Sequence, residues 1–83
     1  MWYVYFIENA EKGFMYTGYT SDLRSRLQQH NAGESQSTKH YAPLKLVSYV
    51  AVRSEKNAQS LEKYFKTGSG KAILKKRILQ LKS

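Results

Sequence analysis

Two stretches rich in apolar residues near the start of the chain predict a pair of β-strands. Residues 1–7 and 14–19 carry mostly aromatic and β-branched side chains, which favour extended structure. Between them, residues 8–13 are polar and end in Gly13, as in a hairpin loop. The pattern therefore predicts an antiparallel hairpin at the start of the chain.

The expected register of this hairpin places two tyrosines side by side. If Ile7 faces Phe14, antiparallel pairing sets Tyr5 opposite Tyr16, and residues opposite one another point to the same sheet face. The other face carries Trp2, Val4, Phe6 and Met15. Because both faces present apolar or aromatic side chains, we expect helices on each side of the sheet.

Residues 22–31 have the pattern of a short helix. Thr20 or Ser21 is a suitable N-cap, and Leu23 and Leu27 form an apolar stripe one turn apart. The polar residues that follow, 33–41, are expected to form a loop of a length that often serves binding.

The second half of the chain predicts one more strand and two more helices. Residues 44–52 follow Pro43 and are rich in strand-forming side chains. A helix then begins at the N-cap Ser54, and its expected buried face consists of Ala58, Leu61 and Phe65. Residues 67–70 break this helix, and Ser69 is the expected N-cap of a third. The expected inner side of the third helix comprises Ile73, Leu74, Arg77, Ile78 and Leu81.

The resulting order, β-β-α-β-α-α, predicts an α+β fold in which a small three-stranded antiparallel sheet is flanked by helices. With 83 residues, the chain is expected to be one domain spanning residues 1–83. The Gly68-Ser69-Gly70-Lys71 segment lacks the spacing of a phosphate-binding P-loop and follows a helix, so it is interpreted as a helix–helix turn.

Charge is unevenly distributed along the chain. Its net charge is +8, and residues 53–83 hold nine basic and two acidic residues, which leaves a net charge of +1 for residues 1–52. A basic half of this kind favours nucleic acid over an anionic membrane as the partner, because its lysines alternate with a globular apolar pattern. The lysines expected to contact nucleic acid are Lys66, Lys71, Lys75 and Lys76.

Several classes of site are excluded by composition. The chain has no cysteine, so it holds no disulfide and no thiolate zinc site. Its two histidines are too few for an all-histidine metal site, so any metal would rest on carboxylates and water. No apolar run approaches the roughly 20 residues of a membrane span, and no signal peptide is visible. A soluble cytoplasmic protein is expected.

Four polar or aromatic side chains stand out, although each has a simpler interpretation when taken alone. Tyr5 and Tyr16 are expected to share a sheet face, and tyrosines there usually serve packing. Arg26 and His30 are spaced to share a helix face beside the apolar stripe. A single arginine or histidine near a helix end is most often a surface residue. The order of these four residues along the chain favours a functional role over these simpler interpretations.

Four sequence elements together resemble one nuclease superfamily. They are the triplets Tyr3-Val4-Tyr5 and Tyr16-Thr17-Gly18, about ten residues apart, the pair Arg26 and His30, and Glu62 within a later helix. With these elements the chain resembles the GIY-YIG nuclease superfamily over nearly its whole length. The segments around Pro43 and Gly68 are similar to the small single-domain branch of that superfamily.

The resemblance implies a metal-dependent endonuclease that hydrolyses phosphodiester bonds in DNA, including structured or damaged DNA. It implies one divalent ion, Mg²⁺ or Mn²⁺, held by Glu62. Tyr5 would act with His30 to deprotonate the attacking water, since a tyrosine with a pKa near 10 needs a proton acceptor beside it. Arg26 would hold the scissile phosphate, and Tyr16 would orient the phosphate or the water.

The chain departs from the superfamily pattern at two places. Tyr3 stands where the first triplet has a glycine, and residues 67–83 lack the asparagine that some family nucleases use near the C-terminus. Two alternatives to an independent nuclease are therefore kept. One is a basic nucleic-acid-binding module that is weakly active or inactive, and the other is a nuclease subunit that needs a protein partner for targeting. DNA is favoured over RNA, and the sequence leaves the oligomeric state open.

Overall fold

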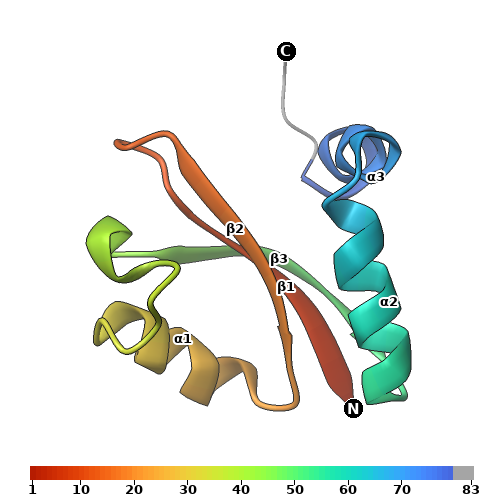
Figure 1. The fold of residues 1–83 in the computed structure, drawn as a ribbon, viewed down its shortest axis with the longest axis horizontal. Coiled ribbons are helices and arrows are strands. Elements are labelled where there is room, and N and C mark those ends of the chain that lie inside the picture. The colour runs from red at the N-terminus through yellow and green to blue at the C-terminus, as the bar shows by residue number, and fades with distance from the viewer. Residues whose placement is uncertain (80–83) are drawn as a thin grey trace.

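The computed structural model, which describes residues 1–79, has a three-stranded antiparallel sheet of order β2-β1-β3 with helices on both faces. The strands are β1 (Trp2–Asn9), β2 (Phe14–Thr20) and β3 (Lys45–Val52). The helix α1 (Leu23–Asn31) lies on one face, and α2 (Glu55–Phe65) and α3 (Gly68–Ile73) lie on the other (Figure 1). The predicted α+β fold and its order of elements are confirmed. No helix in the described part of the chain is long and apolar enough to cross a membrane.

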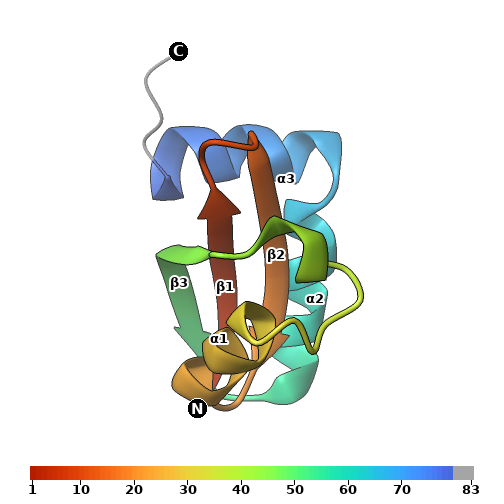
Figure 2. The same cartoon turned by 90° about the vertical axis from the view of Figure 1, so that its left-hand side faces the viewer.

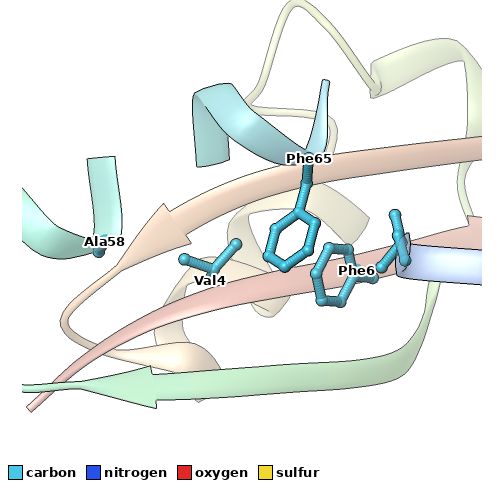
Figure 3. Close-up of a cluster of buried hydrophobic side chains, with 5 residues drawn as sticks. Val4, Phe6, Ala58 and Phe65 are labelled. Atoms are coloured by element: carbon cyan, nitrogen blue, oxygen red, sulfur yellow. The ribbon is translucent and has the colours of Figure 1, made fainter. Parts of the chain in front are cut away.

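Two apolar clusters, one on each face of the sheet, hold the helices in place. Val4 and Phe6 of β1 point toward Ala58 and Phe65 of α2 (Figure 3), and the Phe6 and Phe65 rings meet edge to face with centroids 5.4 Å apart. Leu61 packs against this cluster, so the predicted buried face of α2 is confirmed. The second cluster joins the sheet to α1 through Tyr5, Ile7, Leu44, Leu23 and Leu27.

The predicted hairpin register was wrong by two residues. Ile7 pairs with Tyr16, and Tyr5 pairs with Gly18, because β1 continues to Asn9 and the loop is correspondingly shorter. Asn9 stays in the strand since its side chain accepts from the Lys12 backbone N–H (3.1 Å) and donates to the Tyr41 carbonyl (2.8 Å). A shift of two residues preserves the faces of a strand, so Tyr5 and Tyr16 still share one, as diagonal neighbours.

Two helix caps differ from the prediction. Asp22 caps α1 instead of Thr20 or Ser21, because its carboxylate reaches the backbone N–H of the first turn. Thr67 caps α3 in place of Ser69, with its hydroxyl 3.0 Å from the Gly70 backbone nitrogen. The predicted cap at Ser54 is confirmed.

The inner side of the last helix was predicted only in part. α3 is short and passes into a π-helical turn, Leu74–Ile78, which changes the angle between successive side chains. Leu74 is buried and Ile78 packs on the core, whereas Ile73 and Arg77 are exposed. Leu81 lies outside the described residues.

Candidate active site

Four of the five predicted catalytic side chains line one pocket at the edge of the sheet. Tyr5 of β1, Tyr16 of β2, Arg26 of α1 and Glu62 of α2 surround a volume of about 360 Å³, and His30 lies directly behind Tyr5. Figure 2 shows β2 as the edge strand, with α1 in front of it and α2 behind it. Side chains from the two faces of the sheet therefore meet at this edge, at β2.

A continuous chain of polar atoms runs inward from the pocket. The hydroxyl Oη of Tyr5 lies 2.8 Å from His30 Nε2, and His30 Nδ1 lies 2.6 Å from Thr38 Oγ1. The exposed fraction is 2% for Tyr5 and 0% for both His30 and Thr38. Both nitrogens of this imidazole are therefore hydrogen-bonded, and no water competes for them. His30 is more deeply placed than its predicted position at the edge of the helix–sheet junction.

The loop that supplies Thr38 is fastened to the β1–β2 hairpin. It contains a short 3₁₀ helix, Lys39–Tyr41. The carbonyl of His40 accepts from Lys12 Nζ at 2.9 Å, and the Tyr41 ring stacks on Phe14 with centroids 3.8 Å apart. These contacts fasten the loop to the β1–β2 hairpin and keep Thr38 against the imidazole.

The surroundings of Tyr5 and His30 favour the uncharged forms of both side chains beside the positive charge of Arg26. Burial raises the pKa of the Tyr5 hydroxyl, an effect that Arg26 opposes through a hydrogen bond of 3.4 Å from its Nε–H to Oη. Burial, together with the positive charge of Arg26, lowers the pKa of His30. At neutral pH the site thus holds an uncharged phenol, an uncharged imidazole and a guanidinium.

Gly18 allows the Tyr5 ring to cross the edge strand. A Cβ at position 18 would lie 2.5 Å from Tyr5 Oη and 3.0 Å from a ring carbon of Tyr16. The Tyr5 and Tyr16 ring centroids are 6.4 Å apart, and this spacing exists because no side chain separates them at position 18. The glycine of the second triplet is thus explained by close packing against the hydroxyl of the first.

Glu62 is the carboxylate of this pocket, and it is already paired. Its Oε2 accepts from Lys66 Nζ at 2.9 Å, with 15% of the Glu62 side chain exposed, while the same ammonium lies 5.7 Å from the Tyr16 ring centroid. Within residues 1–79 no three His, Cys, Asp or Glu side chains gather as a metal cage. One carboxylate beside an open pocket fits a hard divalent ion that keeps most of its waters, and does not fit structural zinc.

Three residues around the site were missed at the level of sequence. Trp2 lines the pocket, Gly18 makes room for Tyr5, and Thr38 contacts His30. Gly18 stands within the second triplet, so a signal for it was present. Thr38 carried none, because a threonine in a polar loop gives no indication that the fold buries it.

Comparison with known proteins shows the family of the chain. The GIY-YIG catalytic domain family matches residues 1–77 of the chain. The chain belongs to the GIY-YIG nuclease family. A UPF0213 protein of Streptococcus pyogenes serotype M5 (strain Manfredo) is 43% identical over 65 residues, which cover 77% of this chain and 70% of the relative. A UPF0213 protein of Streptococcus pyogenes serotype M3 (strain ATCC BAA-595 / MGAS315) is 42% identical over 65 residues, which again cover 77% of this chain and 70% of the relative. No solved structure matches the chain.

Proposed function

We propose that this GIY-YIG protein is an endonuclease that cuts DNA with the help of one divalent ion, Mg²⁺ or Mn²⁺. The observation that carries the proposal is the meeting of Tyr5, Tyr16, Arg26 and Glu62 in one pocket, with His30 hydrogen-bonded behind it. These residues come from four different elements, and packing alone gives no reason to collect them at one sheet edge.

Tyr5 and His30 form the proposed proton path. The attacking water gives its proton to Tyr5 Oη while Tyr5 passes its own proton to His30 Nε2, 2.8 Å away. The water oxygen forms the new bond to phosphorus as the bond to the leaving oxygen breaks. A buried tyrosine with a raised pKa is a poor base by itself, so the neutral imidazole is what makes the transfer feasible.

Arg26 and Tyr16 are the proposed phosphate contacts. The Arg26 guanidinium lines the pocket and donates to Tyr5 Oη, so it stabilises negative charge both on the phosphate and on the tyrosyl oxygen during proton transfer. Tyr16 lies beside Tyr5 and orients the phosphate or the water.

Glu62 is the proposed metal ligand. A bound Mg²⁺ or Mn²⁺ would neutralise phosphate charge and stabilise the leaving oxygen. A metal bound at Glu62 Oε2 would displace the Lys66 ammonium, which would then be available to the DNA backbone. Lys66, Lys71, Lys75 and Lys76 are the proposed backbone contacts; the first three line a second pocket beside the site, and Lys76 is exposed.

The proposal is tested by incubating the protein with duplex, flap, junction and single-stranded DNA and their RNA counterparts, in Mg²⁺ or Mn²⁺. We expect cleavage of DNA that Glu62→Ala and Tyr5→Phe each reduce by at least about 100-fold, because each removes a group acting on the reacting atoms. Glu55→Ala is the matched control, since Glu55 lies on the same helix but is exposed and outside the pocket. Circular dichroism verifies folding. Equal cleavage by the wild type and both site variants would contradict the assignment.

A nucleic-acid-binding module without catalysis is the second candidate. The observation that favours it is the ion pair between Lys66 and Glu62, which occupies the carboxylate that a metal would need. It predicts salt-dependent binding with intact DNA after prolonged incubation with metal.

A further inference from the structure

A second pocket lies next to the candidate active site and is not required by the proposed chemistry. It has a volume of about 540 Å³, within the roughly 300–1,000 Å³ of small-molecule sites. Its apolar lining comes from Met15, Phe65, Leu74 and Leu79. Tyr16 lines both this pocket and the active-site pocket, so the two are adjacent. We refer to it as the β2–α3 pocket.

Positive charge borders the β2–α3 pocket. Lys66, Lys71 and Lys75 contribute to its lining, and no carboxylate among residues 1–79 does. Within residues 1–79, Lys66 pairs with Glu62, whereas Lys71 and Lys75 have no ion-pair partner. A ligand of this pocket should therefore combine a flat apolar body with a nearby anion.

We propose that the β2–α3 pocket binds the base of one nucleotide of the substrate strand, adjacent to the nucleotide whose phosphate is cut. The base lies on the apolar lining around Met15, and Lys71 and Lys75 hold the phosphate attached to it. This inference rests on the proposed function for its choice of nucleic acid as the ligand.

Three physical arguments favour a nucleotide over other occupants. Bases present π-faces that stack on apolar and aromatic surfaces without sequence preference, and their phosphates suit lysine ammonium groups. Tyr16 lines both pockets, so a nucleotide in the β2–α3 pocket would lie beside the proposed position of the reacting phosphate. A base can lie in this pocket only after leaving its stack, which is easiest where the base is unpaired or mismatched.

The chain offers a direct probe, because its two methionines are Met1, which is 68% exposed, and Met15, which lines the pocket. Protein with ¹³C-labelled methionine methyl groups is titrated in EDTA with tetrathymidylate, with the same backbone carrying abasic sugars, and with tetraglutamate. We expect tetrathymidylate to shift the Met15 signal and leave Met1 unchanged. We also expect it to bind at least about fivefold more tightly than the abasic strand, since stacking of even one base is worth that much.

Variants locate the effect. Met15→Glu should abolish the difference between tetrathymidylate and the abasic strand, Met15→Leu should keep it, and Lys71→Ala with Lys75→Ala should weaken both strands about equally. If Met15→Glu fails to fold, two measurements still test the proposal. They are the shift of the Met15 signal in the wild type and the affinity of the variant with Lys71→Ala and Lys75→Ala for the two strands. Equal binding of the three probes, or base-dependent binding with an unmoved Met15 signal, would overturn the proposal. Because EDTA prevents cleavage, base-dependent binding by a protein that never cuts DNA would reject the proposed catalysis and retain this pocket.

Discussion

His30 lies between two hydroxyl groups, and its tautomer decides whether it can act. Nε2 can accept the Tyr5 proton only if it is unprotonated, and Nδ1–H must then donate to Thr38 Oγ1, 2.6 Å away. The opposite tautomer satisfies the same distances but leaves Tyr5 without an acceptor. Thr38 is therefore a positioning residue for the proposed proton path, and it acts through His30.

Thr38→Val should impair cleavage by about 10- to 100-fold, a part of the 10²–10⁴ that general base catalysis supplies. The valine keeps the volume of threonine but leaves a buried imidazole nitrogen without a partner, at a cost of about 1–3 kcal/mol in stability. Thr38→Ser restores the hydroxyl and should recover cleavage. The ¹⁵N chemical shifts of His30 report the tautomer directly. An unchanged tautomer and unchanged rate in Thr38→Val would remove Thr38 from the proton path.

The lowered pKa of His30 predicts a specific pH dependence. The unfolded chain binds a proton at this residue near pH 6.5, whereas the folded chain, with its buried neutral imidazole, does so only at lower pH. The free energy of unfolding should therefore fall as the pH is lowered from 7 through about 6.5 and below. The acid limb of the cleavage rate should lie below pH 6.5 for the same reason. Urea unfolding of wild type and His30→Gln at several pH values tests this, and an identical slope in both would count against it.

At the scale of elements, the hairpin register positions the site. Tyr5 lies opposite Gly18, and Tyr16 lies on the same face two residues earlier in β2. The ring of Tyr5 therefore crosses the edge strand at the residue without a side chain. A register one residue different would turn Tyr5 away from α1 and separate it from His30.

Gly18→Ala should displace the Tyr5 hydroxyl, because the added Cβ lies 2.5 Å from Oη. We expect a loss of about 1–3 kcal/mol in stability, as for other overpacked positions, together with a large loss of cleavage. Gly68→Ala is a suitable control, since a Cβ there meets no atom within 4 Å. Chemical denaturation and the cleavage assay provide the two measurements. Wild-type activity in Gly18→Ala would show that the close approach of Tyr5 is dispensable.

At the scale of the whole molecule, three of the basic residues of the second half lie beside the site. α2, α3 and the following turn bring Lys66, Lys71 and Lys75 to the β2–α3 pocket, next to the pocket that holds Glu62. The charge that the sequence showed only as a bias along the chain is thereby concentrated beside the proposed reaction centre. Such a surface favours association with nucleic acid at low ionic strength.

The salt dependence of DNA binding should report these contacts. Replacing Lys71 and Lys75 with alanine should reduce the slope of log affinity against log salt by about 0.7 to 0.9, because the two lysines hold one phosphate and one phosphate contact contributes that much. Lys45→Ala with Lys56→Ala is the matched control, because these lysines are exposed and line neither pocket. Fluorescence anisotropy over a range of salt concentrations measures the slope. Equal slopes for the two double variants would show that the backbone contacts lie elsewhere.

The sequence by itself determined the type and order of the elements, because strand and helix periodicities are local and are strong in this chain. Through its resemblance to the GIY-YIG superfamily it also predicted Tyr5, Tyr16, Arg26, His30 and Glu62 as site residues, and they remain the proposed ones. The strand faces were recovered despite the wrong register, because an error of two residues preserves them.

Only the tertiary structure decided how these residues meet. Contacts between Thr38 and His30, and between Gly18 and Tyr5, depend on how a loop and an edge strand pack, and no local pattern encodes them. The burial that lowers the pKa of His30, the ion pair that occupies Glu62 and the apolar pocket beside Tyr16 likewise arise from packing between elements. The periodicity of the sequence sets which face of a strand or helix a side chain occupies. The distances between the side chains of the site are set only when the strands and helices pack around a common core.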